Sequence, residues 1–243
     1  MPELPEVETV RQQLARKIVG RKIKGRRIVA LRRRGKILII DFIGGSSLVF
    51  HLKMTGQLIF NGKPSRYTRK VFNFDNGSRL IFNDARKFGW YKTVKNTDSI
   101  NKELGPEALE IGSAAFKQAL AKRPNSKIKP LLMDQKFIAG IGNIYSDEIL
   151  FASRVHPLRF VKTLNEQEVK IIFKNIKKIL KKAIEMRGSS IRHYIDACGR
   201  EGEYANRHRV YQREKCSFCS SRIKRIKIGG RSAYFCPKCQ LFA

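Results

Sequence analysis

The sequence predicts an α+β protein in which a β-rich N-terminal part, opened by one helix, precedes a helical part and a short cysteine-bearing module. Three observations support this class. Strand-like stretches flank glycine turns between residues 36 and 95, helical periodicity extends over residues 113–186, and two Cys-x-x-Cys pairs lie near the C-terminus. A chain of 243 residues is long enough for one large domain or two modest ones, each with its own core.

The N-terminal residues predict a helix that begins near Pro5. Proline and acidic residues favour the first helical turn, and Glu6 and Glu8 follow Pro5 closely. We interpret Glu6 as an acid that stabilises the helix N-terminus. Apolar side chains then recur on one face, at Val7, Val10 and Leu14. A basic stretch containing several glycines follows the helix as far as Lys36.

Strand-like segments make up most of the chain from Lys36 to the middle nineties. They are residues 36–43, 46–51, 71–74, 79–82 and 88–95. Gly44-Gly45 separates the first two segments, and Asp75-Asn76-Gly77 separates the next two. Both are favoured hairpin turns. The first part of the chain is therefore expected to consist of antiparallel hairpins.

The pattern becomes helical after Gly105 and Pro106. Asn165 and Glu168 have the spacing of a capping box, with asparagine as the capping residue. An apolar stripe follows, at Val169, Ile172, Phe173, Ile176, Ile179, Leu180 and Ala183. Most lysines of this helix lie off the stripe, and we interpret them as a solvated face. Gly188 is expected to end the helix.

The charge of the chain indicates a polyanionic partner. Lys and Arg number 51 against 20 Asp and Glu, which gives a formal net charge of +31. Such a charge repels itself in the folded state, so a polyanion is expected to compensate it, with nucleic acid favoured over a membrane surface. The apolar runs are far shorter than the ~20 residues of a membrane span, and the N-terminus is unlike a signal peptide. We expect a soluble, intracellular protein.

Four of the five cysteines form the pattern of a structural zinc site. They are Cys216, Cys219, Cys236 and Cys239. Two Cys-x-x-Cys pairs can place four thiolates around one ion, whereas two separate redox pairs are the weaker alternative. The residues between the pairs alternate in polarity and turn at Gly229-Gly230, which predicts a β-hairpin held by one Zn²⁺ per chain. The odd residue, Cys198, is expected to be a packed thiol.

Residues 131–150 predict two helices joined by a glycine turn that contains Gly140 and Gly142. Backbone N–H groups at such a turn, where a helix begins, suit a phosphate group. Asn143 lies at this position and can add a side-chain donor. Because Gly-x-Gly turns are common, this segment alone is only moderately specific for nucleic acid.

Taken together, these motifs resemble the formamidopyrimidine-DNA glycosylase branch of the Fpg/Nei family. The resemblance rests on the N-terminal sequence Met-Pro-Glu-Leu-Pro-Glu-Val-Glu-Thr-Val, on Gly105-Pro106-Glu107, on residues 135–150 and on the four-cysteine hairpin. It covers essentially the whole chain in the order of the family. It implies an N-terminal β-sandwich with flanking helices at residues 1–108, a helix-two-turn-helix domain at 109–209 and a Cys₄ zinc finger at 210–243.

The resemblance implies a bifunctional DNA glycosylase and abasic-site lyase of base excision repair. Pro2, freed by removal of Met1, is the implied nucleophile that forms an iminium with the sugar. Glu3 is the implied proton-transfer group, and Lys36 is implied to bind the phosphate beside the lesion. Arg231, at the tip of the zinc hairpin, is implied to hold phosphate and assist the second of the β- and δ-eliminations.

Further residues are implied to bind double-stranded DNA that contains damaged bases or abasic sites. Met54, Arg86 and Phe88 match the three side chains that fill the gap left by a flipped nucleotide. Arg123, Lys129 and Asn143 are implied phosphate contacts. The implied protein is a bacterial-type cytoplasmic monomer, associated with the nucleoid when it is bound to DNA.

The chain departs from the family pattern in ways that leave its lesion open. The segment before Lys36 is shorter than usual, and Ala85 and Lys87 flank Arg86 where proline and arginine are usual. Oxidised purines such as 8-oxoguanine and formamidopyrimidines are the expected substrates, with oxidised pyrimidines or other lesions as the alternative. A non-catalytic relative that binds damaged DNA, and a zinc-ribbon protein that binds RNA or the ribosome, are the competing function classes.

Overall fold

The computed structural model describes residues 1–191 and 193–242 and divides the chain into two compact units. The first unit comprises Met1–Glu103 and Ala183–Ala205, and the second comprises Leu104–Lys182 and Asn206–Ala243. Residues 183–205, which the sequence pattern groups with the helical part, thus pack in the first unit. The expected domain boundaries at residues 108 and 209 stay a prediction.

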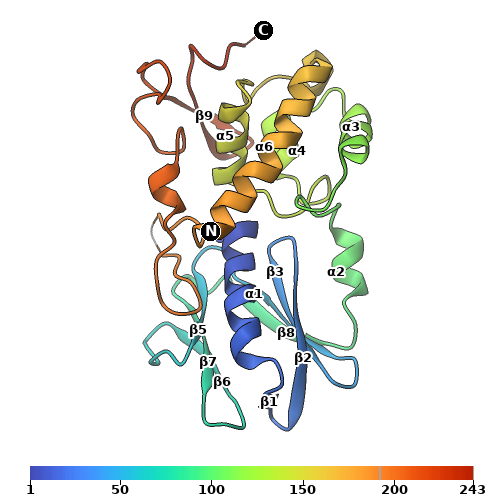
Figure 1. Ribbon diagram of the computed structural model, residues 1–243, viewed down its shortest axis with the longest axis vertical. Helices are drawn as coiled ribbons and strands as arrows, with labels where there is room; N and C mark the ends of the chain where they lie inside the picture. The colour runs from blue at the N-terminus through green and yellow to red at the C-terminus, as the bar shows by residue number, and fades with distance from the viewer. Residues whose placement is uncertain (192, 243) are drawn as a thin grey trace. The chain divides into compact units, whose positions relative to one another are not determined.

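The first unit contains two antiparallel sheets and a long helix (Figure 1). One sheet has the order β1-β2-β3-β4-β8, and the other has the order β5-β7-β6. The strands of the first sheet are Lys22–Ile23, Arg26–Arg34, Ile37–Phe42, Ser47–His51 and Trp90–Val94 for β1, β2, β3, β4 and β8. Those of the second are Gly56–Phe60, Thr68–Asn73 and Arg79–Asp84 for β5, β6 and β7. Helix α2, Asp98–Glu103, ends this part of the chain.

The core of the first unit lies between the two sheets and under helix α1, Leu4–Ile18. The ring of Phe50 on β4 packs edge-on against Phe72 of β6 and Phe82 of β7, at centroid distances of 5.6 and 5.8 Å. These contacts join the inner faces of the sheets, as expected for a sandwich. Val7, Val10 and Leu14 of α1 are buried in the same cluster, so the predicted apolar face of this helix is confirmed.

The strand patterns predicted from the sequence correspond to β3, β4, β6, β7 and β8, and the two glycine turns connect antiparallel pairs as expected. Two features were not predicted. The basic stretch before Lys36 forms β1 and β2, and the β2 side chains Ile28 and Leu31 both reach the core because the register shifts between Ile28 and Ala30. Strand β5 also went unpredicted, since its register depends on pairing with the distant strand β7.

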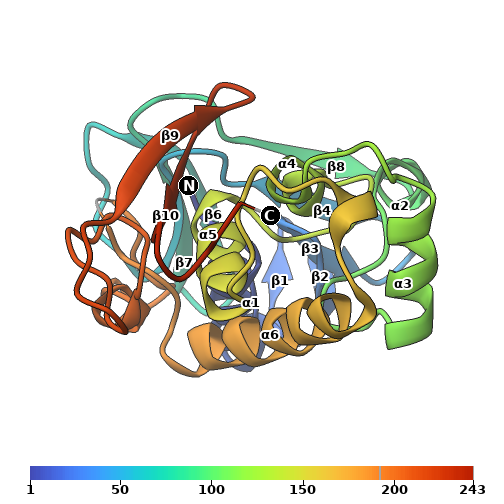
Figure 2. The same cartoon turned by 90° about the horizontal axis from the view of Figure 1, so that it is seen from above.

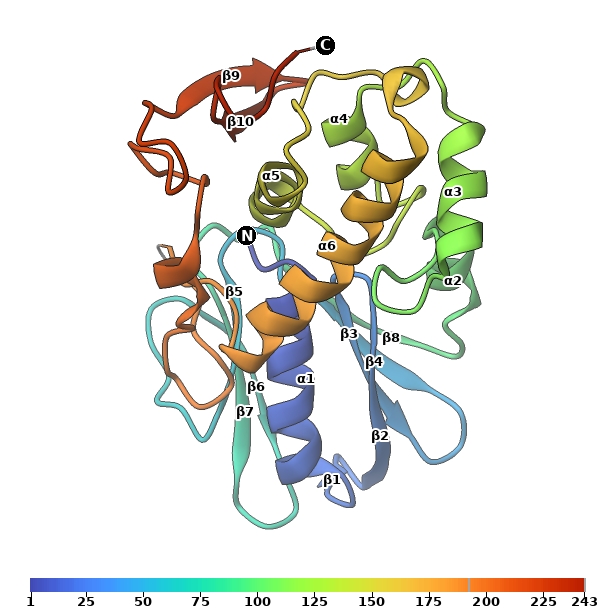
Figure 3. The same ribbon diagram turned by 45° about the horizontal axis from the view of Figure 1, so that its top comes forward.

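The second unit contains helices α3 to α6 and a two-stranded hairpin (Figure 3). The helices are Ser113–Ala121, Ile128–Met133, Asn143–Ala152 and Glu166–Glu185, the last of which ends in the first unit. Strands β9, Lys224–Ile228, and β10, Arg231–Phe235, pair in antiparallel register (Figure 2). Short 3₁₀ helices lie at Val161–Thr163 and Tyr204–Arg207. The expected α+β class, with N-terminal sheets, a helical region and a C-terminal hairpin, is confirmed.

Helix α6 begins at the predicted capping box. The side chain of Asn165 accepts the Glu168 N–H at 2.8 Å, and the Glu168 carboxylate accepts the Asn165 N–H at 2.9 Å. The expected stripe is buried at Ile172, Ile176, Leu180 and Ala183. Lys170, Lys174, Lys178, Lys181 and Lys182 are exposed, as expected for a solvated face. Among the described residues, no helix combines the length and apolarity that crossing a bilayer requires.

Candidate functional site

The N-terminus of α1 holds Pro2 and Glu3 in buried positions. Glu3 is the N-cap of the helix. Its side chain accepts the Glu6 N–H, while its own N–H donates to Glu6 Oε2 at 2.7 Å. The other oxygen of Glu6 accepts the Ser189 N–H at 2.8 Å. One buried carboxylate therefore joins the backbone of Glu3 to the segment that follows α6.

Glu6 thus has a larger part in the site than its predicted role at a helix N-terminus. Gly188 leaves space for this carboxylate, since a Cβ there would lie 2.7 Å from Glu6 Oε1. The hydroxyl of Tyr194 also donates to the Glu6 carbonyl at 3.4 Å. Burial raises the pKa of Tyr194 well above its usual value, and the negative charges of Glu6 and Asp196 add to this effect. The hydroxyl therefore stays protonated and remains a donor.

Lys36 immediately precedes β3 and is 8% exposed. Its neighbour Ile37 pairs with His51 on β4. Burial first, and then the positive charges of Lys53 and Lys36, lower the pKa of His51 to about 4. His51 is therefore neutral at physiological pH, and its Nδ1 accepts the Lys53 N–H at 3.0 Å. A neutral imidazole adds no further repulsion to the buried ammonium of Lys36.

The loop after β7 is organised by Asp84, a residue that the sequence pattern did not indicate. This carboxylate is 1% exposed. It accepts the hydroxyl of Thr55 and the Gly89 N–H, the latter at 2.6 Å. The Thr55 hydroxyl in turn accepts the Arg86 N–H at 3.0 Å. Such side-chain acceptors fix the backbone of a short loop, and this loop projects Arg86 and Phe88.

Arg86 and Phe88 are both exposed and in contact with each other. Phe88 is 57% exposed, and the Arg86 guanidinium lies 5.0 Å from the centre of its ring. Met54, the third predicted gap-filling residue, is partly buried beside Thr55 in the turn before β5. A large apolar side chain held in solvent by a fixed loop is suited to contact bases rather than to stabilise the core.

The turn between α4 and α5 is held by Gln135. Its amide nitrogen donates to the carbonyls of Met133 and Ile141, both at 2.8 Å, and its oxygen accepts the Gly140 N–H at 2.9 Å. Asn143 is the first residue of α5, and its buried Oδ1 has no hydrogen-bond partner among the described residues. A carbonyl oxygen only accepts hydrogen bonds, so a phosphate contact would use the side-chain N–H groups of Asn143 instead, and this contact stays a prediction.

Lys129, expected to contact phosphate, instead lies inside the second unit, with a side chain that is 1% exposed. Its ammonium donates to Asp147 Oδ1 and to the carbonyl of Ser232, both at 2.7 Å. The second oxygen of Asp147 accepts the Tyr234 N–H at 3.1 Å. Burial raises the pKa of Asp147 to about 7, against the opposing effect of the Lys129 charge. This pair links α4 and α5 to the hairpin, and a phosphate contact stays a prediction.

Glu148, the next residue, is a second organising carboxylate that the sequence pattern did not indicate. It is 2% exposed and accepts the N–H groups of Arg209, Val210 and Tyr211. These bonds attach the start of the cysteine module to α5. Arg231, at the first position of β10, and Arg123, in the turn after α3, are exposed as expected for residues that grip phosphate.

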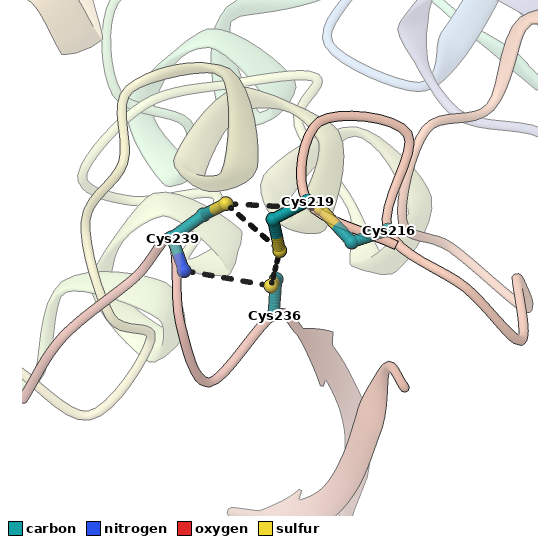
Figure 4. A group of neighbouring side chains, drawn as sticks. All are labelled: Cys216, Cys219, Cys236 and Cys239. Carbon is teal, nitrogen blue, oxygen red and sulfur yellow. Dashed lines mark hydrogen bonds between the residues drawn. The ribbon is translucent and has the colours of Figure 1, made fainter. Parts of the chain in front are cut away.

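The four predicted cysteines converge on one point (Figure 4). Their sulfur atoms lie within 4.8 Å of one another, and three of the pairs are 3.4, 3.5 and 3.7 Å apart. A tetrahedron of sulfurs around Zn²⁺, with Zn–S bonds of about 2.3 Å, has edges of roughly 3.8 Å. The donor set therefore fits a single zinc ion. Cys198 is exposed, so the expectation of a packed thiol is wrong.

The predicted site residues are divided between the two compact units. Those of the first unit are Pro2, Glu3, Lys36, Met54, Arg86 and Phe88. Those of the second are Arg123, Lys129, Asn143, Arg231 and the four cysteines. The organising residues Glu6, Asp84, Gln135 and Glu148 were not predicted as site residues, although Glu6, Gln135 and Glu148 lie in the stretches on which the resemblance rests. Their hydrogen bonds to backbone groups show what they do.

Three family models match successive parts of the chain. The formamidopyrimidine-DNA glycosylase N-terminal domain matches residues 1–25 and 21–91, the formamidopyrimidine-DNA glycosylase H2TH domain matches 104–194, and the zinc finger found in FPG and IleRS matches 213–241. The two N-terminal matches meet around the β1–β2 turn, where the sequence pattern indicated a shortened segment. The zinc-finger match and the sulfur geometry together identify the four cysteines as a structural zinc site.

Full-length relatives and solved structures agree with these models. The formamidopyrimidine-DNA glycosylase of Pelotomaculum thermopropionicum is 40% identical over 273 residues, which cover 99% of both chains. That of Carboxydothermus hydrogenoformans is 39% identical, with 99% of this chain and 100% of the relative covered. The Lactococcus lactis Fpg in complex with abasic-site DNA is 35% identical, with a TM-score of 0.90 and coverage of 99% and 100%. MutM in complex with DNA containing carbocyclic 8-oxo-G has a TM-score of 0.89 at 35% identity and the same coverage.

Proposed function

Because this chain belongs to the formamidopyrimidine-DNA glycosylase family, we propose that it is a bifunctional glycosylase and abasic-site lyase that removes oxidised purines from double-stranded DNA. The proposal depends chiefly on one observation. Pro2 and Glu3 are buried together at the first turn of α1, where Glu6 fixes the backbone of Glu3. Preorganisation of this kind is what a nucleophile and its proton-transfer partner require.

Pro2 becomes a secondary amine once Met1 is removed. An α-amino group titrates near ~8, so a substantial fraction is neutral and nucleophilic at physiological pH. Its lone pair attacks C1′ as the bond from C1′ to the damaged base breaks and the base departs. Glu3 delivers a proton to the sugar ring oxygen, the ring opens, and loss of the amine proton completes an iminium between Pro2 and C1′.

The iminium then drives strand cleavage. As an electron sink it acidifies the 2′ proton, whose removal expels the 3′ phosphate in the β-elimination. A second elimination expels the 5′ phosphate. Lys36 holds the phosphate beside the lesion, and its buried position just before β3 supports a fixed role rather than a loose surface contact. Arg231 at the hairpin tip is the cation that stabilises the second departing phosphate.

The loop side chains Met54, Arg86 and Phe88 occupy the gap left by the flipped nucleotide. Phe88 inserts between bases, and Arg86 donates hydrogen bonds to the unpaired base opposite the lesion. Asn143 and Arg123 bind phosphate from the second unit. One zinc ion keeps the hairpin that bears Arg231 folded. The enzyme acts as a monomer on DNA in a bacterial-type cytoplasm, where it associates with the nucleoid.

Borohydride trapping tests this proposal. Purified protein without Met1 is mixed with duplexes that contain either 8-oxoguanine opposite cytosine or an abasic site, and borohydride reduces any iminium to a stable cross-link. We expect a covalent complex on both duplexes, and its loss in Pro2→Gly with Met1 retained. Trapping on the abasic duplex alone would keep the lyase and redirect the search to oxidised pyrimidines. Tight binding without trapping on either duplex would identify a non-catalytic binding protein.

A further inference from the structure

Arg187 lies two residues beyond the end of α6 and has an unusual backbone conformation. Its backbone has φ +59°, in the left-handed region that disfavours side chains with a Cβ. A helix commonly ends with glycine or asparagine in this conformation. An arginine here accepts backbone strain, which persists only where surrounding contacts compensate for it.

The side chain of Arg187 makes contacts that can compensate for this strain. Its Nη2 donates to Glu203 Oε1 at 2.7 Å and to the Glu201 carbonyl at 3.3 Å. Its Nε lies 3.6 Å from Asp196 Oδ2, close enough for an ion pair but too far for a hydrogen bond. One guanidinium therefore contacts both ends of the segment formed by residues 196–203, which we call the 196–203 loop.

Asp196 is the buried end of this contact. It is 0% exposed, and its Oδ1 accepts the N–H groups of Cys198 and Arg200, both at 2.9 Å. Its Oδ2 accepts the side-chain amide of Gln13 on α1 at 2.8 Å. Arg200 also approaches Asp196, but at 3.9 Å and with a side chain that is 65% exposed. Of these two described cations, Arg187 is thus the better placed to face the buried carboxylate.

The 196–203 loop is connected to the catalytic end of α1. Glu203 forms a β-bridge with Ser189. The Ser189 N–H donates to Glu6 Oε1 at 2.8 Å, and Glu6 Oε2 accepts the Glu3 N–H at 2.7 Å. This continuous series of contacts places the loop and Glu3 in one hydrogen-bonded structure within the first unit. The loop is therefore connected, through Ser189 and Glu6, to the backbone of the residue that we propose acts on the sugar.

We propose that Arg187 is a positioning residue that holds the 196–203 loop in the arrangement needed for base removal and is dispensable for cleavage at an abasic site. This inference rests on the proposed function. Base removal requires the damaged base to be held while its bond to C1′ breaks, and we assign this role to the loop that Ser189 and Glu6 connect to Glu3. An abasic site has no base, so its cleavage depends on Pro2 and the phosphate contacts alone.

Arg187→Gly is the informative variant, because glycine relieves the backbone strain while removing all three side-chain contacts. The matched control is Arg154→Gly. Arg154 is also an arginine with positive φ, +56°, and its side chain is exposed. The Cζ atom of its guanidinium lies 5.9 Å from the centre of the Phe218 ring. Both variants lose one positive charge and one strained residue. Only Arg187→Gly loses contacts with the loop, and Arg187→Lys restores a cation that can still reach Glu203.

Hydrogen exchange tests the positioning role without any assay of activity. In Arg187→Gly we expect the amides of residues 196–203 to exchange about tenfold faster, because local opening becomes easier. In Arg154→Gly these amides should exchange as in the unaltered protein, and Arg187→Lys should fall between the two. Unchanged exchange in Arg187→Gly would overturn the inference, whether or not the proposed function holds.

The second measurement compares base release with strand cleavage in single-turnover reactions. The probes are a duplex with 8-oxoguanine opposite cytosine, a duplex with formamidopyrimidine-guanine and a duplex with an abasic site. In Arg187→Gly we expect base release to fall about 10- to 100-fold, as for a slightly misplaced reacting group, and abasic cleavage to stay within about twofold. An equal fall in both rates would contradict the proposal. If the unaltered protein cleaves none of the duplexes, the proposed function fails separately.

Discussion

Lys129 and Asp147 form an ion pair inside the second unit, with 2.7 Å between Nζ and Oδ1 and with side chains that are 1% and 0% exposed. Each partner also holds the backbone of β10, Lys129 at the Ser232 carbonyl and Asp147 at the Tyr234 N–H. A buried pair of this kind is costly to break, because the remaining charge has no solvent to stabilise it. The pair therefore determines where the hairpin that bears Arg231 is anchored.

We expect Lys129→Met to destabilise the protein by about 3–5 kcal/mol, because the buried Asp147 must then either stay charged without its cation or take up a proton. Urea unfolding measures this change. The matched control is Lys117→Met, which removes an ion pair with Glu166 whose side chains are 61% and 71% exposed. That variant should leave the free energy of unfolding nearly unchanged. Equal effects of the two substitutions would contradict a structural role for the buried pair.

Phe88→Ala should weaken binding to lesion-containing duplex about 10- to 100-fold, since the loss of one base–aromatic stack costs ~1–3 kcal/mol. The midpoint of thermal unfolding should hardly change, because the ring is 57% exposed. Fluorescence anisotropy and a thermal melt measure the two quantities. Tyr67→Ala is the control, as Tyr67 is 43% exposed and also lies against an arginine, Arg66, at 4.8 Å. Similar losses of affinity in both variants would contradict a specific role for Phe88.

His51 makes stability depend on pH. Its pKa is about 4 in the folded protein, against 6.5 as the ordinary value. Between these values the unfolded chain binds more protons than the folded chain, so the stabilisation is complete above pH ~6.5 and is lost as the pH falls towards 4. Lowering the pH from 7.5 to 5 should cost about 2 kcal/mol through this group.

Urea unfolding at the two pH values, compared between the protein and His51→Asn, isolates this effect. Asparagine retains an acceptor for the Lys53 N–H and does not titrate. The pH-dependent loss of stability should therefore be smaller in the variant. His193→Asn, at an exposed position of the same unit, is the control. An identical pH dependence in His51→Asn and in the unaltered protein would show that protonation of His51 does not lower the free energy of unfolding.

Removal of zinc should unfold the hairpin and weaken DNA binding by roughly tenfold or more, because the cation at its tip is no longer held in place. Chelation followed by metal analysis and anisotropy measures both effects. Cys239→Ser should reproduce the loss, whereas Cys198→Ser, which changes an exposed thiol outside the cluster, should keep one zinc per chain. Full DNA affinity in the metal-free protein would show that DNA binding does not require the zinc-stabilised hairpin.

Local sequence patterns determined much of this protein. A proline and two acids predict where α1 begins, turn residues predict the hairpins β3–β4 and β6–β7, and the spacing of Asn165 and Glu168 predicts the start of α6. The cysteine pairs predict a metal site that the sulfur positions support. These features are predictable because each depends on residues close together in the chain, or on a chemistry that only one residue type supplies.

Tertiary structure alone decided how the charged side chains are used. Nothing near Lys129 in the sequence indicates that its ammonium is buried against Asp147. Likewise, nothing near Arg187 indicates that its guanidinium pairs with Asp196 and Glu203. Glu6 reaches Ser189 across 183 positions of the chain. The physical reason is that the pairing of a polar group depends on which distant backbone atoms the fold brings within about 3 Å, and short-range periodicity contains no information about those distances.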